Sequence, residues 1–132
     1  MALAELSVKV DHQYQQWIKV SRGTLADGRV DCNEARQWLS WYKDRKKDLD
    51  LLKREIRLEL GAIRSAFKIK IVSAPLGHKT DVRNEQTLAV APFEELLRKI
   101  ERLSIEGERL KPTLERFLEK DCTRAKEAPA TT

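Results

Sequence analysis

The chain has 132 residues and a formal net charge of +5; charged residues make up 36% of it, and aromatic residues 6%. This length fits one domain, and the few aromatic residues, five glycines and four prolines favour long, narrow helix packing over a thick globular core. No apolar run is long enough to span a bilayer, and Glu5 without a preceding basic segment argues against a secretory signal.

The first element is predicted to be an amphipathic helix over residues 2–20, because apolar residues recur there at helical spacing. It should end near Gly23, since glycine readily adopts the left-handed conformation at a helix end. Asp31, followed three residues later by Glu34, is typical of a capping box in which Asp replaces the usual Ser or Thr. This pair predicts the start of a second helix.

The segment between these helices, GTLADGRVDCNE at residues 23–34, resembles part of a calcium-binding EF-hand loop. Asp27 and Glu34 match positions five and twelve of that loop, but Gly23 and Leu25 stand where positions one and three normally supply carboxylates. Because calcium needs about six to eight oxygen ligands, we expect a joint between two helices here and no bound metal.

The second helix is predicted over residues 32–71, a length of about 60 Å at a rise of 1.5 Å per residue. Large apolar residues follow one another at steps of four or three along it, with one interruption at Arg45, which is the pattern of a helix that packs along a narrow seam. The residues of this seam are Trp38, Tyr42, Leu49, Leu52, Ile56, Leu60, Ile63 and Phe67.

The third helix is predicted over residues 92–122, because Pro92 suits a first helical turn and a seven-residue repeat follows it. Residues 72–91 then form a long loop. A short β-hairpin is an alternative, because apolar and polar residues alternate weakly at the two ends of this segment. Residues 123–132 are expected to be disordered. The apolar residues of the third helix form a matching seam: Leu96, Ile100, Leu103, Leu110, Leu114 and Phe117.

Folding the second and third helices against each other aligns their seams in five layers and places Gly107 opposite Ile56. The expected layers are Phe67 with Leu96, Ile63 with Ile100, Leu60 with Leu103, Leu52 with Leu110, and Leu49 with Leu114. We therefore predict an all-α fold with a long, coiled-coil-like antiparallel helical hairpin. The shorter N-terminal helix packs at its open end, and residues 1–122 form a single domain.

The two cysteines are too few for a disulfide framework and lack the spacing of a metal site. The expected register places Cys122 near Trp41, about 13 Å along the helix from Cys32, so no disulfide is expected between them. This cysteine content favours a cytoplasmic protein without a metal or other cofactor.

A stripe of cations on the second helix can be interpreted in two ways: Lys43, Lys47, Arg54, Arg57, Arg64 and Lys68. It can be a nucleic-acid-binding face, because regularly spaced cations displace counterions from phosphates. Alternatively, it can pair with a glutamate stripe on the third helix: Glu94, Glu101, Glu108 and Glu115. We favour the second interpretation, because the charge excess is modest and no aromatic residues interleave with the cations.

No catalytic set can be assembled, because His12 and His78 lie in different elements and no nucleophile motif or phosphate-binding loop is present. We predict a non-catalytic protein–protein interaction or assembly module that forms homo-oligomers and does not bind a membrane. The alternative is a small nucleic-acid-binding accessory protein. The partner-binding residues are expected among the aromatic residues at the base and the apolar residues off the seam: Trp38, Trp41, Leu51, Leu58, Leu97, Ile105 and Leu118.

Overall fold

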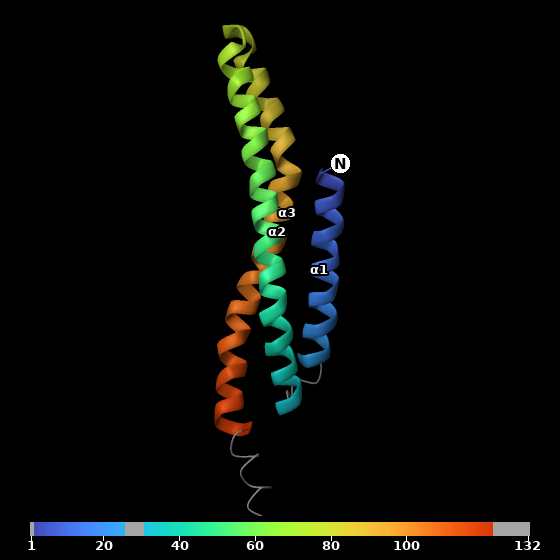
Figure 1. Ribbon diagram of the computed structural model, residues 1–132. Helices are drawn as coiled ribbons and strands as arrows, with labels where there is room; N and C mark the ends of the chain where they lie inside the picture. The colour runs from blue at the N-terminus through green and yellow to red at the C-terminus, as the bar shows by residue number, and fades with distance from the viewer. Residues whose placement is uncertain (1, 26–30, 123–132) are drawn as a thin grey trace, which may run out of the picture.

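The computed structural model describes residues 2–25 and 31–122, and within them every regular element is helical (Figure 1). The two longest helices form an antiparallel hairpin, and the first helix lies along the half of the hairpin that is far from its turn (Figure 1). This arrangement confirms the predicted all-α fold. The elements are α1 (Ala2–Leu25), α2 (Cys32–Ser73), the 3₁₀ turn η1 (Leu76–His78), α3 (Lys79–Phe117) and the π-helical turn η2 (Leu118–Cys122).

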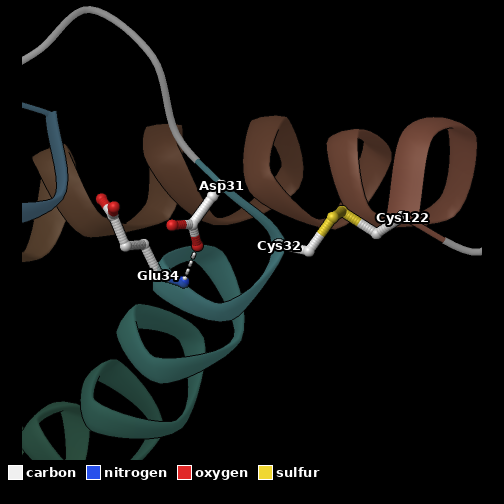
Figure 2. Close-up of a disulfide and its surroundings, with 4 residues drawn as sticks. All are labelled: Asp31, Cys32, Glu34 and Cys122. Carbon is white, nitrogen blue, oxygen red and sulfur yellow. Dashed lines mark hydrogen bonds between the residues drawn. A yellow bond between two sulfur atoms is a disulfide. The ribbon is translucent and has the colours of Figure 1, made fainter. Parts of the chain in front are cut away.

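The start of α2 is fixed by the predicted cap. The backbone N–H of Glu34 donates to Oδ1 of Asp31 at 2.7 Å, and Asp31 has extended backbone angles (Figure 2). This bond satisfies one of the amides that a helix leaves unpaired in its first turn. Residues 26–30 of the EF-hand-like segment lie outside the described part of the chain, as does the predicted disordered tail at 123–132.

The predicted loop over residues 72–91 is wrong, because α2 continues to Ser73 and α3 already begins at Lys79. Pro75 explains the sharp end of α2, since the residue before a proline is pushed into the extended region and Ala74 has φ −71° and ψ 143°. Pro92 does not start α3 but lies inside it. Val90 and Phe93, on either side of this proline, are both buried, so α3 packs against the core there.

The predicted register of the hairpin is also wrong. A Cβ on Gly107 would meet the ring of Tyr42 rather than Ile56. Leu60 and Leu97 line the same hollow, whereas Leu60 was expected opposite Leu103. The shorter turn draws α3 along α2 by at least one helical turn, so the seams are matched differently from the five expected layers.

The core nevertheless consists mainly of the predicted seams. Residues of α1 join it at the base, where the bundle has three helices, whereas Ile63 and Phe67, in the part of α2 closer to the turn, are only half-buried. The buried residues from α1 are Leu6, Val10 and Trp17; those from the two seams are Trp38, Tyr42, Leu49, Leu52, Ile56, Leu60, Leu96, Ile100, Leu103 and Leu114.

Candidate interaction surfaces

An aromatic cluster joins the three helices at the base of the bundle. The rings of Trp38 and Tyr42 stack with centroids 4.9 Å apart, and Trp17 of α1 contacts both edge-on at 5.8 Å. The indole N–H of Trp17 donates to Glu106 of α3 at 3.0 Å. Trp38 has 0% of its surface exposed, so it is a core residue and cannot contact a partner as predicted, whereas Trp41 is half-buried.

A polar network closes one side of this cluster. The hydroxyl of Tyr42 donates to Oε1 of Glu108 at 2.9 Å, and Nζ of Lys46 lies 3.0 Å from the same oxygen. Burial and then the bond to Glu108 raise the pKa of Tyr42 well above its ordinary value, while the bonds from Lys46 and Tyr42 lower the pKa of Glu108. The phenol of Tyr42 therefore stays neutral and the carboxylate of Glu108 stays charged at neutral pH. The network holds α2 against α3.

A disulfide closes the open end of the hairpin. It joins Cys32, the first residue of α2, to Cys122, the last residue of η2, with Cα atoms 5.6 Å apart (Figure 2). The bond spans 90 residues of sequence, and Cys122 is 1% exposed. The expectation that these cysteines remain apart is therefore wrong, and the cause is the register: the observed pairing of α2 with α3 brings the two ends together.

The basic stripe of α2 is partly used within the molecule. Arg57 pairs with Glu101 at 3.6 Å and Arg64 pairs with Glu94 at 3.5 Å. Two of the six cations of the stripe therefore pair with glutamates of α3 as expected, and Lys46, which lies outside the stripe, meets a third glutamate, Glu108. Four cations of the stripe are exposed and have no ion pair within the described residues: Lys43, Lys47, Arg54 and Lys68.

The predicted off-seam residues divide into two groups. Leu51, Leu58 and Ile105 are 53%, 67% and 51% exposed, so they remain available to a partner. Leu97 and Leu118 are half-buried and pack against the core.

Sequence reasoning missed four further exposed apolar residues near the hairpin turn: Ile69, Val72, Leu76 and Leu88. Three of them lie in the segment 72–91, which was predicted to be a loop, and residues in a loop cannot be assigned to the face of a helix. For Ile69 and Val72 the available signal was their spacing from Leu58, which continues a helical pattern along α2.

Residues 2–25 and 31–122 were also compared with the requirements of a metal site and of a membrane-spanning helix. No group of three or more His, Cys, Asp or Glu side chains there could hold a metal ion, and no helix there is long and apolar enough to cross a membrane. Comparisons with known protein families, curated proteins and solved structures found no match.

Proposed function

We propose that this chain is a non-catalytic protein–protein interaction or assembly module that self-associates. The observation that carries the proposal is the exposure of large apolar side chains on the outer sides of two long, regular helices. Leu51, Leu58 and Ile105 each have more than half of their surface in water. Single exposed leucines are common, but burying several against one partner contributes roughly 25 cal/mol for each Å² removed from water.

The architecture adds a second argument. α1 covers only the base of the hairpin, and the part nearer the turn consists of two helices alone (Figure 1). Two helices leave much of each apolar face open to water, which is why Ile63 and Phe67 stay half-buried in this region. A helix supplied by another molecule would cover these faces as α1 covers the base.

The disulfide bears on where such a module works. Cytoplasmic location remains the prediction from the cysteine count, but disulfides persist mainly in oxidising compartments and are rare in the reducing cytosol. The bond between Cys32 and Cys122 therefore weighs against a cytoplasmic location and favours an oxidising one.

The alternative, a small nucleic-acid-binding protein, is favoured by the four cations of the basic stripe that have no ion pair among residues 2–25 and 31–122. Against it, Arg57 and Arg64 of the same stripe are already engaged by glutamates. A phosphate backbone would also meet those glutamates, which repel it. We therefore keep this function second.

Molecular mass in solution tests the proposal. Analytical ultracentrifugation over a range of micromolar concentrations should show a species heavier than the monomer mass of 15.3 kDa, and added DNA or RNA should not change it at physiological salt. Leu58→Glu on α2 and Ile105→Glu on α3 show which of the two exposed apolar faces, if either, joins the copies, and Val8→Glu is the matched control because Val8 of α1 is 70% exposed. A monomer at every concentration would refute self-association, and a mass increase on adding nucleic acid would support the alternative.

A further inference from the structure

The outer face of α2 carries a second set of residues with the spacing of a helix-packing seam. Positions 51, 55, 58, 62, 65, 69 and 72 alternate four and three residues apart, as the buried seam of α2 mostly does. All seven side chains are exposed, with Leu58 at 67%, Ile69 at 69% and Val72 at 73%. We call this set the outer seam: Leu51, Glu55, Leu58, Ala62, Ser65, Ile69 and Val72.

A row of cations flanks the outer seam on one side. Lys47, Arg54 and Lys68 fit a seven-residue spacing, with Gly61 at the position between the last two. All three cations are exposed and have no ion pair among residues 2–25 and 31–122. We call them the cation row. In paired helices, charges at such positions select the partner and its orientation.

Two acidic groups beside the cation row are paired elsewhere, and a third, Asp44, is exposed near Lys47 and forms no ion pair with it. Glu55 lies 3.2 Å from Lys9 of α1, and Asp50 lies 3.6 Å from Lys53. Five of the seven positions of the outer seam are therefore apolar, and the cations along one edge have no ion pair among residues 2–25 and 31–122.

Two hollows lie along the outer seam where a partner's side chains could insert. One, of about 210 Å³, lies between α1 and α2 and is lined by Leu51, Glu55 and His12. The other, of about 470 Å³, is lined by Leu58 and by Arg54 of the cation row. Between Leu58 and Ile69, a Cβ on Gly61 would have no atom within 4 Å, so a partner can approach the helix closely there.

We propose that the outer seam binds an amphipathic helix of another protein whose apolar stripe is flanked by Asp or Glu. This inference rests on the proposed function as an interaction module and specifies the chemistry of the partner. The partner's leucine-like side chains cover Leu58, Ile69 and Val72, and its carboxylates meet the cation row.

A second copy of α2 fits the outer seam poorly. In an antiparallel pair the two cation rows would lie side by side and repel. In a parallel pair the cation row would face Leu52, Glu59 and Ser73 of the other copy. Only Glu59 is acidic, and Leu52 is buried, so most of the cations would lack a partner. Self-association then uses other residues, and Ile105 of α3 is the first candidate because it is 51% exposed.

Two designed peptides test the inference. Each has about four heptads with leucine at the seam positions. They differ only in the flanking positions, which are Glu in one and Lys in the other. Fluorescence anisotropy with the full, disulfide-bonded chain should show at least roughly tenfold tighter binding of the Glu peptide at low salt. The preference should shrink as salt is raised, because the charges are exposed.

Variants assign the binding to the outer seam. Leu58→Glu should abolish binding of the Glu peptide, and Gln at all three positions of the cation row should remove the preference between the peptides. Ile105→Glu and Val8→Glu are matched controls that place the same charge on exposed apolar positions elsewhere, and both should bind the Glu peptide like the wild type. Circular dichroism confirms that every variant keeps its helical content.

Several outcomes would overturn the inference. These are equal affinity for both peptides, no binding of either, loss of self-association in Leu58→Glu, or tight binding of DNA or RNA that the Gln variant loses. The proposed function fails separately: a monomer that binds the Glu peptide refutes self-association alone. A stable oligomer that ignores both peptides refutes the inference alone.

Discussion

Two glycines of the hairpin should respond in opposite ways to the same substitution. Gly107 of α3 lies against the ring of Tyr42, and an added Cβ would come within 3.0 Å of three ring and hydroxyl atoms. The Tyr42 ring cannot easily withdraw, because it stacks on Trp38 and its hydroxyl is bonded to Glu108. Gly61 of α2 has no atom within 4 Å of the same added group.

The magnitude follows from two terms. Replacing a mid-helix glycine by alanine gains about 1 kcal/mol from helix propensity. Overpacking a close contact costs roughly 1–3 kcal/mol. Gly61→Ala should therefore stabilise the chain by about 1 kcal/mol, whereas Gly107→Ala should be neutral or destabilising by up to about 2 kcal/mol. Because the propensity term is common to both variants, the difference between them measures the contact with Tyr42.

Chemical denaturation of both variants, with the disulfide intact, measures this difference as roughly 1–3 kcal/mol. Gly107→Ala should cost less in a Tyr42→Leu background than in the wild type, because that background lacks the ring that the new methyl group meets. Equal stabilisation by the two alanines would refute the close approach, and with it the register of α2 against α3.

Four further changes test other parts of the fold. Serine at both Cys32 and Cys122 should cost roughly 2–5 kcal/mol, because the bond spans 90 residues; reductant should lower the melting temperature of the wild type alone. Asp31→Ala should cost about 1 kcal/mol in denaturation, and Asp31→Asn much less, because only alanine removes the capping oxygen. Leu103→Asp should cost several kcal/mol and lower the melting temperature, since Leu103 is 2% exposed and an aspartate there has no partner. Tyr42→Phe should be less stable than the wild type at neutral pH, but it should lose less stability above about pH 10. Above that pH the phenol of Tyr42 ionises in the unfolded chain but not in the folded one, because folding raises its pKa, so the wild type loses stability. The difference in melting temperature between the two proteins should therefore be smaller at about pH 11 than at about pH 8.

Much of the fold could be predicted because it depends on local chemistry. The apolar spacing of α2 identified most of the residues that are buried, and the carboxylate of Asp31 with Glu34 three residues later marked the helix start. The pairing of α3 glutamates with α2 cations also follows from charge alternation beside a seam. The apolar seam and the cap are each read from the sequence of one helix alone.

The register of α2 against α3 could not be predicted, because it depends on where the chain turns. The position of that turn depends on how a single residue, Pro92, is interpreted. Pro92 lies inside α3 in this fold, yet by its local chemistry it fits the first turn of a helix, since it needs no backbone N–H there. The resulting twenty-residue loop shifted α3 along α2, placed Gly107 opposite the wrong side chain and separated the two cysteines. The disulfide was therefore excluded by the same error that misplaced the loop.

The spacing of apolar residues identifies a helix face that can pack against another helix. It does not say whether that other helix belongs to the same chain. On α2 the buried seam and the outer seam have similar spacing, and charge distinguishes them. Beside the buried seam, cations meet the glutamates of α3, whereas the cation row beside the outer seam has no such counterpart among residues 2–25 and 31–122. In our proposal, the cations beside the outer seam select a partner helix by its charge, which is why an acidic amphipathic helix is the partner to test.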